Sequence, residues 1–500
     1  MFNVLFVKIV YKPHPPAPLR WRGGAVGRIS PPLHRRGGRG VRLLISLMQK
    51  IHFIAIGGAA MHNLAIDLHN RGFQITGSDD EIYEPSRTLL AEKGIIPVEM
   101  GWFPEKITTD LSCVILGMHA RVDNPELAKA QELGTKIYSY PEFIYSQSLH
   151  KQRVVIAGSH GKTSITSMIL HVLKFHNRKF DYMVGARIEG FDTMAKLSDA
   201  PVIVIEGDEY LSSPIDRQPK FLHYHPHVML MSGIAWDHVN VYPDFNNYVH
   251  QFELLADELE KASSFIYDET DELVKKIGSV ERLGVKRFPY QALPNRIKDG
   301  KTFLILPNKK ELEINIFGEH NLKNLNGARL ILAQIGIDDE EFYAAIPSFK
   351  GAAKRLELVG KNDNTVIYKD FAHAPSKVEA TTKAVKAQFP DRQLVACLEL
   401  HTFSSLNKDF LGEYANKLNA ADVPVVYFSP KTLENKKLPA ITPEDIKVHF
   451  NNPNLHVFTD NDSLKDFLLA QRWRSSNLLM MSSGTFNGLD FSELSKLILM

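Results

Sequence analysis

The sequence predicts an α/β protein of three domains, and three observations carry this prediction. The chain has 500 residues with 44% hydrophobic content, enough for about three separate cores. Apolar runs of strand length precede glycine turns and then stretches with apolar residues at helical spacing, first near residue 51 and again near residue 154. The second turn has the pattern of a phosphate-binding loop.

The phosphate-loop pattern follows the apolar run 154–157 and precedes a helical pattern over 165–173. In such loops backbone N–H groups and the helix N-terminus bind phosphate, while Lys162 would reach the outer phosphates and the Thr163 hydroxyl could bind Mg²⁺. Ile156 stands where the strict pattern has a glycine, so the loop is a shortened variant; an ordinary strand-turn-helix is the alternative. The residues expected to bind ATP here are Gly158, Ser159, His160, Gly161, Lys162, Thr163 and Ser164.

Charge is distributed unevenly along the chain. Residues 1–47 hold nine of the 59 Lys and Arg and no Asp or Glu, which leaves the remaining chain mildly acidic. This opening segment is rich in Pro, Gly and Arg, and such a composition predicts disorder because it buries too little apolar surface. A basic arm or a targeting peptide is one interpretation. We favour translated upstream sequence before a true start at Met48, since a strand pattern begins directly after that residue.

Cysteine and hydropathy patterns indicate the compartment. Only Cys113 and Cys397 are present, far apart and without metal-type spacing, so we expect a reducing cytoplasm and no disulfide framework. No apolar run reaches the length of a membrane span. We expect neither a membrane nor a nucleic acid as partner, and a monomer or weak dimer.

The first folded domain is expected over 48–150, with a Rossmann-like β-α-β unit at its start. An apolar strand leads to Gly57 and Gly58, a helix follows, and the second strand ends at an acidic residue, where a sugar hydroxyl is often bound. Asn63 replaces the third glycine of the dinucleotide pattern, so a nucleotide sugar fits at least as well as a nicotinamide or flavin. The residues expected to bind it are Gly57, Gly58, Ala59, Ala60, Met61, Ser78 and Asp79.

The central domain, expected over 151–348, supplies acids and histidines at strand ends. The apolar run 202–205 ends in Glu206, Asp208 and Glu209, and the run 228–231 is soon followed by Asp237 and His238. Carboxylates at strand ends beside a phosphate loop are typical Mg²⁺ ligands. A solvated turn and a structural histidine are the alternatives.

Several motifs, in this order, resemble the Mur ligases, the ATP-dependent amide-bond ligases of peptidoglycan assembly. The resemblance extends from Met48 almost to the end of the chain and implies a UDP-sugar domain, a P-loop ATPase-like central domain and a Rossmann-like C-terminal domain over 349–500 for the amino acid or peptide. The motifs are Gly158–Ser164, Glu206–Glu209, Asp237-His238, His320-Asn321 with Asn324, Lys354–Glu357 and Asp370–Pro375.

The resemblance implies a role for each motif. ATP would phosphorylate a substrate carboxylate, and an amine would attack the resulting acyl phosphate. Lys162, Glu206, His238 and Arg355 would be catalytic; Thr163 and Glu206 would bind one Mg²⁺ and His238 a second. The remaining ATP-binding residues would be His320, Asn321, Asn324 and Asp370. A surface ion pair is the alternative for Arg355 and Asp370.

The amine substrate is less well defined by the sequence. Phe252 resembles the branch that uses UDP-N-acetylmuramate, where one enzyme adds L-alanine and another adds a recycled tripeptide, L-Ala-γ-D-Glu-meso-diaminopimelate. The stretches 82–86 and 216–224 resemble the tripeptide enzyme, which we favour. A non-catalytic nucleotide-sugar-binding regulator is a further alternative, disfavoured by the intact ATP and metal motifs. The residues expected to bind the peptide are His373, Lys377, His401, Thr402 and Ser404.

Overall fold

A computed structural model describes residues 49–236, 241–352 and 355–500. The expectations for residues 1–47, for Asp237 and His238, and for Lys354 therefore lie outside the described residues. No helix in the described ranges is long and apolar enough to cross a membrane.

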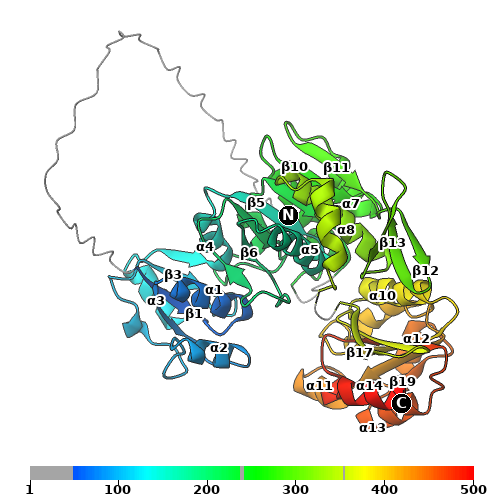
Figure 1. The fold of residues 1–500 in the computed structure, drawn as a ribbon. Coiled ribbons are helices and arrows are strands. Elements are labelled where there is room, and N and C mark those ends of the chain that lie inside the picture. Colours follow the sequence, from blue (N-terminus) through cyan, green and yellow to red (C-terminus); the bar gives the residue numbers. More distant parts are fainter. Residues whose placement is uncertain (1–48, 237–240, 353–354) are drawn as a thin grey trace, which may run out of the picture. The chain divides into compact units, whose positions relative to one another are not determined.

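The first sheet is wholly parallel, with strand order β2-β1-β3-β4 in the described residues (Figure 1). The chain runs from the central strand β1 through helix α1 to β2 on one side, and β3 lies on the other side of β1. The loop after β1 therefore lies at a topological switch point, where such sheets bind ligands. The elements are β1 (Lys50–Ile54), α1 (Ala59–Asn70), β2 (Gln74–Ser78), α2 (Ser86–Glu92), η1 (Pro104–Lys106), β3 (Cys113–Leu116), α3 (Pro125–Glu132), β4 (Ile137–Ser139) and α4 (Tyr140–Gln147).

Local sequence signals fix several helix starts in this region. Helix α4 begins with a capping box in which Ser139 accepts from the Glu142 backbone N–H and the Glu142 carboxylate accepts from Ser139. This reciprocal pair satisfies amide groups that the first helical turn leaves unpaired. Helix α3 begins similarly, with the Asn124 side chain accepting two backbone N–H groups.

The central sheet has the order β11-β10-β9-β5-β8-β6-β7, and only β7 at its edge is antiparallel. Strand β5, which leads into the phosphate loop, lies between β9 and β8, so the segments that follow these two strands flank the loop. The elements are β5 (Gln152–Ala157), α5 (Lys162–Phe175), β6 (Asp181–Met183), β7 (Ala195–Lys196), β8 (Val202–Glu206), η2 (Lys220–His223), β9 (Val228–Met231), α6 (Phe245–Asp257), β10 (Ser264–Asp268), α7 (Glu272–Ser279), β11 (Lys286–Tyr290), α8 (Glu319–Gln334), α9 (Asp339–Ala345) and η3 (Ile346–Ser348).

Two further sheets follow along the chain. A small antiparallel sheet consists of β12 (Asn295–Lys298), β13 (Lys301–Ile305) and β14 (Glu311–Ile314). The C-terminal sheet has the order β15-β16-β20-β17-β18-β19 and is parallel except for β15. Its elements are β15 (Glu357–Lys361), β16 (Thr365–Asp370), α10 (Pro375–Gln388), β17 (Gln393–Leu400), η4 (Lys408–Tyr414), β18 (Val423–Phe428), α11 (Pro430–Asn435), α12 (Pro443–Phe450), β19 (His456–Phe458), α13 (Asn461–Leu469), β20 (Ser476–Met481), η5 (Phe486–Gly488) and α14 (Phe491–Leu499).

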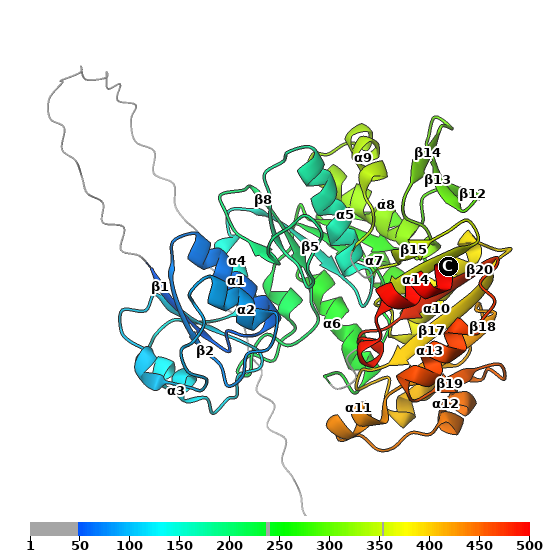
Figure 2. The same cartoon turned by 60° about the horizontal axis from the view of Figure 1, so that its bottom comes forward.

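Helices cover both faces of the large sheets, as parallel sheets require. In the C-terminal sheet, α13 and α14 bury Leu464, Leu468, Leu494 and Ile498 against one face, and α10 contributes Val378 and Val385 to the core on the other (Figure 2). In the central sheet, α5 packs beside α8 over one face. The α/β prediction is confirmed, while the domain boundaries at 48, 151 and 349 stay predictions.

Candidate functional site

The phosphate loop has a backbone that requires glycine at two places. Gly158 has φ 125° and Gly161 has φ 81°, both in the region that disfavours side chains. A Cβ on Gly161 would lie 2.6 Å from the Asn324 side-chain oxygen, and one on Gly158 would collide with Ser232. The segment after β9 and helix α8 therefore close on the loop, and the predicted Asn324 lies against it.

The Lys162 ammonium points back into the protein. Its Nζ donates to the Glu209 carboxylate at 2.7 Å and to the Gly158 carbonyl at 2.5 Å. Burial alone would lower the pKa of Lys162, but the Glu209, Asp208 and Glu206 carboxylates outweigh it and raise the pKa. The cation is therefore held in its charged form, directly beside the expected phosphate position.

Glu206 provides the strongest indication of a bound cation. Its carboxylate accepts from the Gly185 backbone N–H, yet its Oε1 atom is buried and has no hydrogen-bond partner. Burial raises the pKa of Glu206, while the Thr163 side chain, Gly185 and the positive charges of Lys162 and Arg355 act to lower it. A buried carboxylate oxygen next to a hydroxyl fits a hard cation such as Mg²⁺. Thr163 and Glu206, predicted as ligands of one ion, thus lie together.

Two functional-looking residues were not among the expected site residues. Glu209 is fully buried and accepts from Lys162 and from the Tyr248 hydroxyl. Tyr248, on α6, also pairs with Ser159 of the loop at 2.8 Å. The acid run 206–209 was the available signal for Glu209, whereas Tyr248 could not be distinguished from a core aromatic. Phe252, one helical turn later, packs in the core with its ring centroid 5.4 Å from that of Phe221.

The loop histidine and the residues at the start of α8 form one cluster. His160 and His320 are each partly buried. Loss of solvent lowers the pKa of each imidazole to about 4, and neighbouring positive charge acts in the same direction. Both imidazoles are therefore neutral at pH 7. Asn321 donates its side-chain amide to the Phe317 carbonyl at 3.0 Å, so that amide is already used in the helix.

The expected nucleotide-sugar residues gather after β1 and β2. The Gly57 backbone N–H donates to the Asp79 carboxylate at 2.7 Å, and a Cβ on Gly57 would lie only 2.9 Å from that carboxylate. Burial raises the pKa of Asp79 to about 6, against the lowering effect of the Gly57 N–H. Gly58 precedes α1 without a side-chain cap, so the first helical amides are available to an anion.

Arg355 and Asp370 do not form a simple surface ion pair. The Arg355 guanidinium lies over the Phe371 ring at 4.9 Å. The buried Asp370 accepts from the Leu356 and Ala372 backbone N–H groups at 2.6 and 2.7 Å. Burial raises the pKa of Asp370, and Arg355 acts in the opposite direction. Asp370 thereby fixes the backbone directly after Arg355.

The expected peptide-binding residues lie at carboxyl ends of C-terminal strands. His401 follows β17, and its Nδ1 lies 3.7 Å from the buried Glu399 carboxylate, with 39% of the His401 side chain exposed. The Thr402 hydroxyl pairs with Ser405 in a local turn. The His373 ring pairs with the Phe371 carbonyl oxygen at 2.8 Å. The positive charge of Lys377 lowers the pKa of the His160 imidazole. Ser404, half-buried, lies in the same turn as Thr402.

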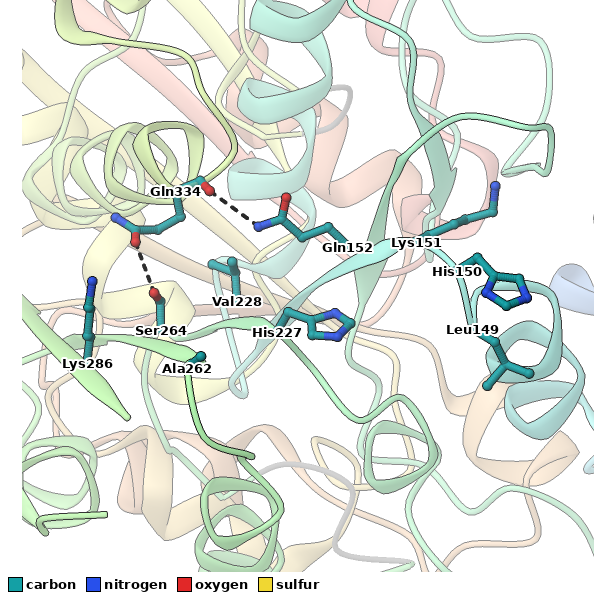
Figure 3. Close-up of a pocket in the computed structure, with 10 residues that line it drawn as sticks. All are labelled: Leu149, His150, Lys151, Gln152, His227, Val228, Ala262, Ser264, Lys286 and Gln334. Atoms are coloured by element: carbon teal, nitrogen blue, oxygen red, sulfur yellow. Dashed lines mark hydrogen bonds between the residues drawn. The ribbon is translucent and has the colours of Figure 1, made fainter. Parts of the chain in front are cut away.

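A cavity of about 570 Å³ lies elsewhere on the central sheet. Figure 3 shows its lining, which includes Gln152, Val228, Ser264 and Lys286 at the starts of β5, β9, β10 and β11. In this lining, the Ser264 hydroxyl donates a hydrogen bond to the Gln334 side-chain oxygen at 2.9 Å. Because the phosphate loop follows the opposite end of β5, this cavity is separate from the candidate site.

Comparisons with known proteins match the chain to three family models. Residues 50–152 match the Mur ligase family catalytic domain, 156–332 the Mur ligase middle domain and 354–484 the Mur ligase glutamate ligase domain. The chain is 27% identical to a UDP-N-acetylmuramate–L-alanyl-gamma-D-glutamyl-meso-2,6-diaminoheptandioate ligase of Haemophilus influenzae, with 90% of this chain and 99% of the relative covered.

Other relatives are named as ligases that add L-alanine to UDP-N-acetylmuramate. The chain is 32% identical to a UDP-N-acetylmuramate–L-alanine ligase of Pediococcus pentosaceus, covering 75% of this chain and 83% of the relative. Among solved structures, a murein peptide ligase from Psychrobacter arcticus matches with TM-score 0.59 and 22% identity, covering 90% of this chain and 98% of that one. A UDP-N-acetylmuramate-alanine ligase from Thermotoga maritima matches with TM-score 0.62 and 19% identity, covering 89% and 97%. The chain therefore belongs to the Mur ligase family of ATP-dependent amide-bond ligases.

Proposed function

We propose that this protein joins UDP-N-acetylmuramate to the tripeptide L-Ala-γ-D-Glu-meso-diaminopimelate, a reaction of peptidoglycan recycling. Support for the ligase chemistry comes from one observation above all, the buried and unpartnered Glu206 Oε1 beside Thr163 and the Lys162 ammonium. Support for the tripeptide comes from the Haemophilus influenzae relative, whose name specifies that peptide and whose length this chain almost fully spans.

The first step is transfer of the γ-phosphoryl group of ATP to the muramate carboxylate. Two anions must meet in this step, so charge neutralisation accounts for most of the catalysis. Lys162, held protonated by Glu209, would offset charge on the outer phosphates, and Arg355, whose positive charge also acts on Glu206, would do the same. Bound Mg²⁺ would supply further neutralisation, with Thr163 and Glu206 as ligands of one ion and His238 of a second.

The second step is attack of the peptide amine on the acyl phosphate, which releases phosphate and forms the amide. The residues we assign to the peptide are His373, Lys377, His401, Thr402 and Ser404; those assigned to the rest of ATP are His320, Asn321, Asn324 and Asp370. The two free carboxylates of the tripeptide need cationic or donor groups. His401 fits such a role because it is half-exposed and oriented by the Glu399 carboxylate.

The alternative amine is L-alanine. Several relatives at 26–32% identity are named UDP-N-acetylmuramate–L-alanine ligases. These names support L-alanine as the amine about as strongly as the Haemophilus influenzae relative supports the tripeptide. The two functions share the fold and the ATP site, and they differ only in the amine.

Phosphate release with ATP, Mg²⁺ and UDP-N-acetylmuramate tests the proposal, with L-alanine, the L-Ala-D-Glu dipeptide and the tripeptide supplied separately. Mass spectrometry identifies each product. We expect the tripeptide to give the highest kcat/KM. Turnover with L-alanine alone would establish the alternative, and no turnover with any amine would contradict both.

A further inference from the structure

Three side chains of metal-ligand type meet at a place the ATP chemistry does not use. They are Glu142 of α4, Asp216 in the segment after β8, and His223 at the end of η2. One ligand atom from each lies within 4.8 Å of the other two, and all three residues are partly buried. It is the single such group in the described ranges. Helix α4 and η2 pack against each other, so the cluster joins two separate elements.

The two carboxylates are already oriented by bonds to the protein. Glu142 Oε2 accepts from the Ser139 backbone N–H at 2.7 Å and from the Ser139 hydroxyl at 2.8 Å. Asp216 Oδ1 accepts from the Gln218 backbone N–H at 3.1 Å. These bonds engage one oxygen of each carboxylate and leave the other for a ligand. Such outer bonds are what orients the ligands of protein metal sites.

The imidazole provides an independent indication. His223 Nε2 is completely buried and has no hydrogen-bond partner, although Asp216 Oδ2 lies only 2.9 Å away. The two atoms are close enough for an ion pair when the imidazole is protonated, but they form no hydrogen bond in this structure. A buried imidazole nitrogen without a hydrogen bond is costly. A cation between the nitrogen and the two carboxylate oxygens would satisfy all three.

We propose that Glu142, Asp216 and His223 form a binding site for a divalent transition-metal ion of the zinc class. One imidazole and two carboxylates are a ligand set that such ions accept. With metal-ligand distances of about 2.0–2.2 Å, two ligands of one tetrahedral ion lie about 3.4 Å apart. The three ligand atoms lie within 4.8 Å of one another, so an ion would require these side chains to adjust, and water would complete the coordination.

An occupied site would brace the acid-bearing segment of the ligase. The acid-bearing segment, residues 207–224, follows Glu206 and includes η2. Within it, the Lys220 ammonium of η2 pairs with the Asp208 carboxylate at 2.7 Å. The ion would tie this segment to α4, the helix directly before β5 and the phosphate loop. The expected role is structural, and it does not depend on which amine the enzyme uses.

Metal titration of the full chain tests this site. Protein freed of metal with a chelator is titrated with Zn²⁺ by calorimetry in the absence of ATP and Mg²⁺, and with Co²⁺ by visible absorption. We expect one saturable site per chain and a rise in melting temperature on Zn²⁺ addition. Absence of any saturable Zn²⁺ or Co²⁺ site in the wild type would overturn the proposal without recourse to variants.

Single substitutions locate the ion. Glu142→Gln keeps the capping box, because glutamine also serves at that position, and Asp216→Asn keeps an acceptor for Gln218. These variants and His223→Gln should each weaken Zn²⁺ binding on the order of 100-fold. His250→Gln, which removes an exposed histidine paired with Glu253, is the matched control and should bind as the wild type does. Zn²⁺ binding that survives His223→Gln but is lost in Glu206→Gln would place the ion at the phosphate loop and refute the site.

Discussion

The phosphate loop and the C-terminal strand ends differ in how much of their polar chemistry is bound within the protein. Around the loop, Lys162, Ser159 and Glu209 all have partners, and the conspicuous exception is one oxygen of Glu206. At the C-terminal strand ends, His401 stands 39% exposed beside a single carboxylate. Under the proposed function, this is the difference between a preformed phosphoryl-transfer site and an amine site that the substrate completes.

The largest expected effect comes from Lys162→Ala. Loss of the loop cation should lower ligation by roughly a thousandfold or more, because Lys162 is the only Lys or Arg side chain in the loop 158–164. Lys174→Ala on the same helix should retain activity, because the Lys174 ammonium donates to the Gly190 carbonyl and lies over the Phe191 ring, away from the loop residues. Steady-state phosphate release measures both. UDP-sugar affinity should be unchanged, and near-wild-type turnover of Lys162→Ala would break the assignment.

Glu206→Gln should separate stability from activity. Burial raises the pKa of Glu206, so its charged form destabilises the folded protein at neutral pH, and a neutral glutamine should raise the melting temperature without nucleotide. Activity should fall on the order of 100-fold and require more Mg²⁺. Glu209→Gln should instead lower the melting temperature, because it leaves the Lys162 cation without its partner. Equal melting temperatures in both variants would contradict the preformed site.

His401→Ala tests the other side of the comparison. We expect kcat/KM for the peptide to fall about tenfold to a hundredfold through a raised KM, with the KM for ATP unchanged. Thr402→Val is the contrasting variant, since the Thr402 hydroxyl bonds Ser405 in a turn. Thr402→Val should raise the KM for the peptide and should in addition lower the melting temperature, because the turn loses this hydrogen bond. A raised KM for ATP in His401→Ala would show that the residue belongs to the nucleotide site.

The smallest effect concerns Asp79 and pH. Its pKa in the folded protein is about 6, above the ordinary value of 3.8. Between these values the folded state retains a proton that the unfolded state has lost, so stability should fall as pH rises from about 4 to about 6 and level off above. Asp79→Asn, which still offers an acceptor to Gly57, should flatten this part of the profile. Thermal melts across pH 4–8 measure it, and an unchanged profile would refute the shift.

The same contrast explains what the sequence could predict. Gly158 and Gly161 are required by backbone geometry, and Lys162 and Thr163 follow at fixed spacing, so the loop could be recognised residue by residue. The alternation of strand and helix patterns likewise predicted the α/β class. Tyr248 could not be predicted because its hydroxyl reaches Glu209 from a helix distant in sequence, and a core aromatic has the same pattern. Thr402 shows the reverse problem, since a polar residue at a strand end can serve a local turn as well as a ligand.

A competition between amines tests the central claim most directly. The enzyme receives ATP, Mg²⁺ and limiting UDP-N-acetylmuramate with equal concentrations of L-alanine and the tripeptide, and mass spectrometry counts the two products. The product ratio equals the ratio of the kcat/KM values. We predict that the tripeptide product exceeds the alanine product on the order of 100-fold, because remote peptide contacts orient the reacting amine. Equal products, or an excess of the alanine product, would contradict the account.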